Sequence, residues 1–246
     1  MEIAGAALVT GASRGIGRAV TEHLARAGFA VAGLYAQADD AAAVVVAALR
    51  AEGRRVTLRR CSVTDRAAVG AAVREAEERF GPLEVLVNCA GITRDGLVAL
   101  MSEADFRAVF EVSFAGACHC CEAVLPGMLA RGRGRIVNVV SISGQRGRAG
   151  QANYACAKGA VTGLTTLLAR RCAGSRVRVN AVAPGLIDTD MARALPAERR
   201  DRFLAATHAG RLGTAAEVAE AVMFLAGPGA GYVSGQVLTV DGGYGV

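Results

Sequence analysis

Three side chains within residues 141–158 could act together on one oxygen atom. Ser141 follows an apolar run, residues 136–140, that is typical of a buried strand, and Tyr154 and Lys158 are four residues apart. On a helix, side chains with this spacing share one face. An ammonium group beside a phenol favours the phenolate and lowers the pKa of the phenol. These residue types therefore predict a site that donates a proton to a carbonyl oxygen.

A glycine-rich segment near the N-terminus could bind phosphates. Gly11, Gly15 and Gly17 lie between a short apolar stretch, residues 6–9, and a helix that we expect to end near residue 27. Glycines permit a tight turn and let backbone N–H groups approach a pyrophosphate at a helix N-terminus, where the helix dipole favours anions. The spacing differs from the commoner G-x-G-x-x-G, but its position between a strand and a helix favours a dinucleotide site over a plain turn.

The segment after the second expected strand, residues 30–35, indicates which dinucleotide. An NAD site usually places a carboxylate there to bind the ribose hydroxyl, but Tyr35 and Ala36 occupy the strand end. Asp39 and Asp40 follow later and suit the start of the next helix. Arg14 could pair with a 2′-phosphate, unless it is merely exposed. We therefore expect NADPH rather than NADH.

Apolar strands alternate with helical segments along the whole chain. Each strand is apolar throughout, which is typical of a parallel sheet covered on both faces, where ligands bind at the carboxyl ends of the strands. The sequence thus predicts an α/β fold, a Rossmann-type doubly wound parallel sheet of about seven strands with helices on both faces. A long helix is expected over 103–130 and another through about 172. The expected strands are 6–9, 30–35, 56–60, 83–87, 136–140, 177–182 and 237–240.

Composition limits the class of protein. The chain has 246 residues, of which 52% are hydrophobic and 20% charged, so we expect a globular protein. No linker divides it, which predicts a single domain over 1–246. Residues 186–209 are polar and arginine-rich and suit a mobile lid. The net charge of +6 leaves two meanings for the arginine clusters at 131–135 and 170–178: solvated surface, or a docking face for an acidic carrier protein.

Several classes of protein are not expected. Aromatic residues make up only 4% and no basic motif is interleaved with them, so we do not expect nucleic-acid binding. The seven cysteines lack the spacing of a disulfide framework, and no signal peptide is recognisable, which predicts a cytoplasmic protein. The segment 118–121 contains a CxxC but no second ligand pair follows, so we expect no metal. No uncharged apolar run reaches the roughly 18 residues that a membrane span needs.

Several separated motifs resemble the short-chain dehydrogenase/reductase family over essentially the whole chain. They are the glycine-rich turn, N-x-A-G at 88–91, Ser141, the Tyr154/Lys158 pair, P-G at 184–185 and D-G-G at 241–243. Residues 92–95, 150–154 and 209–213 are most similar to the 3-oxoacyl-[acyl-carrier-protein] reductases of that family. The resemblance implies hydride transfer from NADPH to a carrier-bound 3-oxoacyl thioester in fatty-acid or polyketide/polyene synthesis, by a homotetramer joined through two long helices.

The same resemblance implies a role for each matching residue. Tyr154 would donate the proton, Lys158 would lower its pKa and hold the nicotinamide ribose, and Ser141 would hydrogen-bond the carbonyl. The implied cofactor contacts are Gly11, Ser13, Arg14, Gly15, Ile16 and Gly17 for the phosphates; Ser62 and Val63 for the adenine; Asn88, Ala90 and Gly91 for the adenosine ribose; and Pro184, Gly185, Ile187 and Thr189 for the nicotinamide.

Three positions depart from the family pattern. Ser113 stands where the family has a fourth catalytic residue, an Asn that holds a water in a proton relay; a hydroxyl can still donate and accept one hydrogen bond, so we expect a rearranged relay. Cys89 replaces an Asn, and Ser62 replaces an Asp or Asn that contacts adenine. Two alternatives therefore stay open: a reductase of a free small ketone, or a weakly active cofactor-binding subunit that forms a hetero-oligomer with an active paralogue.

Overall fold

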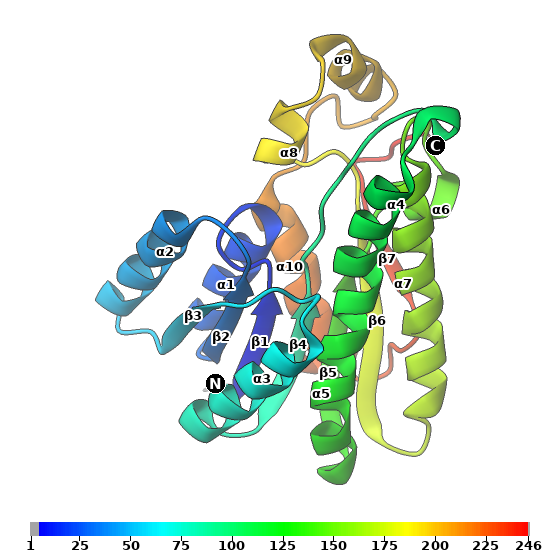
Figure 1. Ribbon diagram of the computed structural model, residues 1–246. Coiled ribbons are helices and arrows are strands. Elements are labelled where there is room, and N and C mark those ends of the chain that lie inside the picture. The colour runs from blue at the N-terminus through cyan, green and yellow to red at the C-terminus, as the bar shows by residue number, and fades with distance from the viewer. Residues whose placement is uncertain (1–4, 246) are drawn as a thin grey trace.

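The computed structural model describes residues 5–245, and its centre is one seven-stranded parallel sheet (Figure 1). The strands run in the order β3-β2-β1-β4-β5-β6-β7, and all six neighbouring pairs are parallel. This confirms the predicted doubly wound Rossmann-type sheet. The strands are β1 (Ala6–Thr10), β2 (Ala30–Tyr35), β3 (Val56–Arg60), β4 (Leu83–Asn88), β5 (Arg133–Val139), β6 (Arg176–Pro184) and β7 (Val237–Val240).

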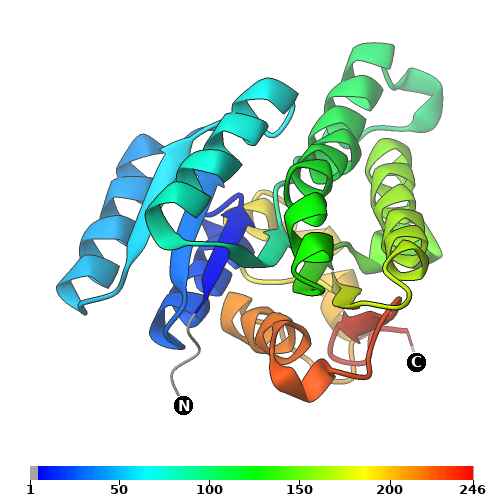
Figure 2. The ribbon, with the colours of Figure 1, turned by 90° about the horizontal axis from the view of Figure 1, so that it is seen from below.

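Helices cover both faces of the sheet, as expected for strands that are apolar throughout (Figure 2). One core packs α1, α2 and α10 against the sheet, and the opposite core packs α3 and α5, with α7 beside them. The covering helices are α1 (Gly15–Arg26), α2 (Asp39–Ala51), α3 (Arg66–Phe80), α5 (Gly116–Ala130), α7 (Ala152–Arg171) and α10 (Ala215–Ala226).

Polar residues fix where several of these helices begin. The Asp65 side chain accepts a hydrogen bond from the Ala68 amide at the start of α3. Thr214 starts α10 with a reciprocal capping box in which Glu217 bonds back to the Thr214 amide. These caps satisfy N–H groups that have no partner inside a helix. Asp39 and Asp40 lie in the first turn of α2, as predicted.

The long helix expected over 103–130 is interrupted. α4 (Glu103–Phe110) passes into a π-helical turn, η2 (Glu111–Ala115), before α5 begins. A π turn inserts an extra residue into a helix and is frequent at functional sites. By length and composition alone, Glu103–Ala130 could also cross a membrane. The mean hydropathy of an 18-residue window within it is 1.4, and 39% of that window is buried. In this fold, α5 packs on α3, β4 and β5, and α4 packs on α7.

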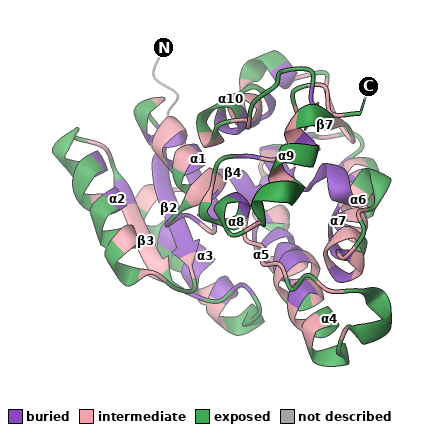
Figure 3. Ribbon diagram, turned by 90° about the horizontal axis from the view of Figure 1, so that it is seen from above, coloured by how far each residue is buried: buried purple, intermediate pink, exposed green. Residues whose placement is uncertain are grey.

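Two further segments lie over the carboxyl ends of the strands (Figure 3). α8 (Asp190–Arg193) and α9 (Ala197–Ala205) occupy the predicted lid region. The short helix α6 (Ile142–Arg146), which the sequence did not predict, follows β5 directly, because the Ser141 hydroxyl accepts a hydrogen bond from the Ser143 amide and caps it. The remaining short turns are η1 (Val98–Leu100) and η3 (Pro228–Ala230).

Candidate active site

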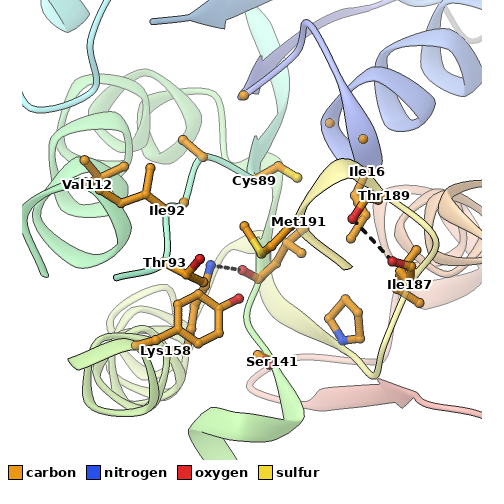
Figure 4. Close-up of a pocket in the computed structure, with 18 of the residues that line it drawn as sticks. Ile16, Cys89, Ile92, Thr93, Val112, Ser141, Lys158, Ile187, Thr189 and Met191 are labelled. Atoms are coloured by element: carbon orange, nitrogen blue, oxygen red, sulfur yellow. Dashed lines mark hydrogen bonds between the residues drawn. The ribbon is translucent and has the colours of Figure 1, made fainter. Parts of the chain in front are cut away.

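A cavity of about 780 Å³ opens at the carboxyl ends of the strands, between the glycine-rich turn, α7 and α8–α9 (Figure 4). This is where ligands bind in open α/β sheets. Of the predicted catalytic and cofactor-binding residues, all line this cavity except Asn88 and Ser113. The structure thus brings together segments from six different stretches of the chain.

Ser141 and Lys158 both lie at the cavity (Figure 4), and Tyr154 lines it with them. Lys158 is 4% exposed, and its Nζ donates a hydrogen bond of 2.7 Å to the carbonyl of Val139, on the strand that leads to Ser141. The same Nζ lies 5.8 Å from the centre of the Tyr154 ring. The i, i+4 spacing on α7 therefore places the phenol and the amine on one face, as predicted.

Burial dominates the protonation of both groups. It lowers the pKa of Lys158 to about 8 and raises the pKa of Tyr154 to about 12, although the neighbouring Ser141 hydroxyl acts on Tyr154 in the opposite direction. The lowering of the Tyr154 pKa that the sequence led us to expect is therefore wrong for this structure. The reason is that desolvation of the phenolate dominates, and Cys89 and Asp95 act in the same direction. The arrangement keeps Tyr154 protonated and ready to donate.

Lys158 is the only lysine in the chain, and every other residue among its 28 lysines and arginines is an arginine. A guanidinium cannot be deprotonated in a protein, whereas a buried lysine amine titrates readily. The one position that has lysine instead of arginine is therefore the position where a titratable amine is buried in the cavity. That the chain has a single lysine was visible in the sequence and points to Lys158 independently of the Tyr154/Lys158 motif.

The glycine-rich turn has room for a pyrophosphate and no side chain that would fill it. Gly11 and Gly15 have φ angles of +67° and +55°, which favour glycine. A Cβ on Gly17 would lie 2.1 Å from the carbonyl oxygen of Gly11, so only glycine fits there. No side chain caps α1 at Arg14, which leaves the first amides of the helix available to an anion. These residues fit a dinucleotide.

The end of β2 differs from the usual site for NAD. The Tyr35 hydroxyl donates a hydrogen bond of 2.9 Å to Asp39, and Arg60 lies 3.4 Å from the other oxygen of the same carboxylate. Asp39 is not among the cavity residues, whereas Tyr35 and Arg14 are. Asp39, the nearest acid, is thus held by Tyr35 and Arg60 outside the cavity. No carboxylate at this strand end would repel a 2′-phosphate bound by Arg14.

Ser113 and Asn88 lie just beneath the cavity surface. The Ser113 hydroxyl is buried in η2 without a hydrogen-bond partner among the described residues. A Cβ built on Gly91 would lie 3.5 Å from this oxygen and 3.4 Å from Lys158 Nζ, so both face the same small space. Asn88, which is buried, instead donates a hydrogen bond of 2.9 Å to Asn138.

Motif reasoning missed a hydrogen-bonded support for the loop after β4. Gln151 donates to both carboxylate oxygens of Asp95, at 3.1 and 3.2 Å, and accepts from the Ser143 hydroxyl at 3.0 Å. Asn153 donates to the carbonyl of Arg94 at 2.8 Å. These bonds tie residues 94–95 to the start of α7. The signal was present in the sequence motifs at 92–95 and 150–154, which carried no assigned role.

The cavity residues with sulfur atoms, which include Met191 and Cys89, also had no assigned cofactor role. Met191 extends from α8 into the cavity, and Cys89 lies beside the glycine-rich turn (Figure 4). Burial raises the pKa of the Cys89 thiol to about 11, so the thiol is protonated at neutral pH. Across residues 5–245, no group of three or more His, Cys, Asp or Glu side chains is placed to hold a metal ion.

Comparisons with known proteins agree with this geometry. Residues 11–245 match the family model described as enoyl-(acyl carrier protein) reductase. The chain is 45% identical over 237 residues to the 3-oxoacyl-[acyl-carrier-protein] reductase FabG of Vibrio cholerae, and 43% identical to that of Escherichia coli, with 96% of each chain covered. It is 41% identical to the enzyme of the same name from Staphylococcus aureus, with 99% of both chains covered.

Proposed function

The chain belongs to the short-chain dehydrogenase/reductase family, and from this premise we propose that it reduces a carrier-bound 3-oxoacyl thioester to the 3-hydroxyacyl thioester with NADPH, in fatty-acid synthesis. The observation that carries the proposal is the convergence of Ser141, Tyr154 and Lys158 in a cavity that also contains the glycine-rich turn. Relatives named for this reaction match nearly the full chain.

Each of the three residues has one task in the proposed reaction. Ser141 hydrogen-bonds the ketone oxygen and orients it toward Tyr154. Tyr154 donates its proton to that oxygen as C3 receives the hydride, which bound NADPH supplies. Lys158 stabilises the resulting phenolate, because its amine becomes protonated more readily once a negative charge forms beside it. Tyr154 regains its proton from solvent, and the space between Lys158 and Ser113 is the route we propose.

NADPH is the proposed cofactor because the cavity residues at the end of β2 include no carboxylate, and Arg14 is placed to pair with a 2′-phosphate. The glycine-rich turn would hold the pyrophosphate. Ser62 and Val63 would contact the adenine, and residues from Pro184 to Thr189 would line the nicotinamide site. Residues 186–209 would act as the lid over it.

Association into a homotetramer through α4–α5 and α7 remains a prediction. Supporting it, Leu97, Val98 and Leu100 before α4 are 65%, 73% and 81% exposed. A second chain that covers such apolar side chains would remove them from water. Measuring the mass of the particle in solution by light scattering tests this.

Reduction of a 2,3-enoyl thioester is the second candidate, because the matching family model is described by that activity. The two reactions are separated by following NADPH oxidation with 3-oxobutanoyl and 2-butenoyl thioesters of an acyl carrier protein, and with a free small ketone. We expect turnover of the 3-oxo thioester alone. Turnover of the enoyl thioester instead, or equal efficiency on the free ketone, would reject the proposal. Turnover only after a paralogue is added would favour the weakly active subunit.

A further inference from the structure

We propose that Arg148 and Arg199 form a phosphate-binding rim at the mouth of the cavity, which receives the phosphate of the pantetheine arm that carries the substrate. This inference rests on the proposed function and extends it to the part of the substrate beyond the thioester. The rim is defined here as Arg148, on the loop between α6 and α7, and Arg199, on α9.

The two arginines meet at one loop, because Arg148 belongs to it and Arg199 reaches it from α9. Arg148 lines the cavity. A Cβ built on Gly150 would lie 3.8 Å from Nη2 of Arg199, so the α9 guanidinium reaches across to the loop that carries Arg148. Figure 1 shows α9 and α6 at the same end of the molecule. The rim therefore spans the entrance between the predicted lid and the catalytic helix.

Neither guanidinium has a carboxylate partner within residues 5–245, although Glu198 and Asp95 lie nearby. Glu198, next to Arg199, pairs with Arg202 at 2.5 Å. Asp95, which lines the cavity, is held by the Gln151 amide. Half of the exposed arginines among residues 5–245, ten of twenty, do have a carboxylate partner, as Arg193 has in Asp188. Two unpaired guanidinium groups at one opening leave it positively charged and able to accept an anion.

A third cation is fixed beside the rim by the C-terminal tail. Arg146 donates a hydrogen bond to the carbonyl of Tyr244, and its guanidinium lies 6.0 Å from the centre of the Tyr244 ring. That ring stacks on Phe203 of α9 at 4.2 Å between centroids. Phe203 and Tyr244 both line the cavity. The aromatic pair supplies an apolar wall for the arm and joins α9 to the loop, which holds the rim in place.

The position of the rim suits the arm and not the cofactor. Cofactor phosphates belong at the glycine-rich turn before α1, on the other side of Ser141 and Tyr154. A thioester that reacts at Tyr154 must extend its arm away from the nicotinamide and out through the mouth, past Arg148. The arm is neutral along most of its length and ends in a phosphodiester, which is the group that planar guanidinium donors recognise.

The test compares two substrates that differ only in the phosphate. NADPH oxidation is measured with 3-oxobutanoyl thioesters of pantetheine and of 4′-phosphopantetheine, for the wild type, Arg148→Gln, Arg199→Gln and the double variant. The preference for the phosphate is kcat/KM with the phosphopantetheine thioester divided by kcat/KM with the pantetheine thioester. We expect this ratio to fall about two- to fivefold in each single variant and about tenfold in the double variant, because KM for the phosphorylated substrate rises. Arg74→Gln on α3, which removes one exposed charge far from the cavity, should leave the ratio unchanged.

Two more substrates identify the source of the phosphate. If the arginine variants lose kcat/KM by the same factor with phosphopantetheine, coenzyme A and carrier-protein thioesters, the result supports recognition of the phosphate that all three arms share. Loss confined to the coenzyme A thioester would overturn the proposal in favour of its nucleotide phosphates, and loss confined to the carrier would overturn it in favour of the carrier surface. An unchanged ratio would also overturn it. If the wild type turned over none of these thioesters, the proposed function itself would fail.

Discussion

Replacing Lys158 by methionine should stabilise the fold while it abolishes turnover. Burial lowers the pKa of this amine from 10.5 to about 8, so folding opposes its charge. A difference of about 2.5 pKa units corresponds to about 3 kcal/mol at neutral pH. Methionine has a similar length and no charge to desolvate. Its drawback is that the carbonyl of Val139 loses the 2.7 Å hydrogen bond from Nζ, which costs about 1–2 kcal/mol.

The net expected gain is about 1–2 kcal/mol in the free energy of unfolding at pH 7. For a chain of this size, that corresponds to a rise in Tm of about 3–6 °C. Thermal unfolding of wild type and variant at equal protein concentration measures it. Lys158→Arg is the matched control, because it keeps a charge that cannot be lost and should be less stable than the wild type.

The pH dependence separates this cause from better packing. The folded pKa is below the unfolded one, so the stability contribution of neutral Lys158 is complete above pH 10.5 and is lost as the pH falls through about 8. The cost of the charge should thus shrink from about 3 kcal/mol at pH 7 to about 1 at pH 10. The advantage of the methionine variant should vanish over that range. An advantage that stayed constant with pH, or a variant less stable at pH 7, would refute the reasoning.

Three further substitutions test the site. Tyr154→Phe should lower kcat by at least about 10²-fold with little change in NADPH affinity, because the phenol is the proton donor; stopped-flow fluorescence and steady-state assays measure both, and an unchanged rate contradicts the mechanism. Ser113→Asn should raise kcat severalfold if the unpartnered Ser113 hydroxyl makes a poor relay, and a lower rate would show that the serine is the better residue here. Gly17→Ala should weaken NADPH binding more than tenfold in calorimetry, because its Cβ would meet the Gly11 carbonyl at 2.1 Å; the Kd of Gly53→Ala, at a turn open to solvent, is the comparison.

The sequence predicted the sheet well because its central strands are apolar on both faces and must therefore be covered by helices on both sides. β4 and β5, for instance, pair in register through Val87 and Val137, both fully buried. It could not predict the π turn at η2, because no residue type encodes a single extra residue within a helix. α6 was also missed, since its cap depends on how Ser141 leaves β5.

The catalytic constellation followed from spacing, but its electrostatics did not. Tyr154 and Lys158 share a face of α7 as their separation requires. The Tyr154 pKa is raised by burial and, in the same direction, by Cys89 and Asp95, which are distant in sequence. The Gln151–Asp95 support was hidden for the same reason: its two members are 56 residues apart.

Because Lys158 is the only lysine, an amine-directed reagent can label the catalytic cavity selectively. Acylating reagents attack neutral amines, and with a pKa of about 8 roughly half of the Lys158 amine is neutral at pH 8. No other side chain of the 246 residues carries an amine. An amine-directed label can therefore enter the molecule only at the catalytic cavity and the N-terminal amine. The mass gained by the intact chain would count how many cavities are open to solvent.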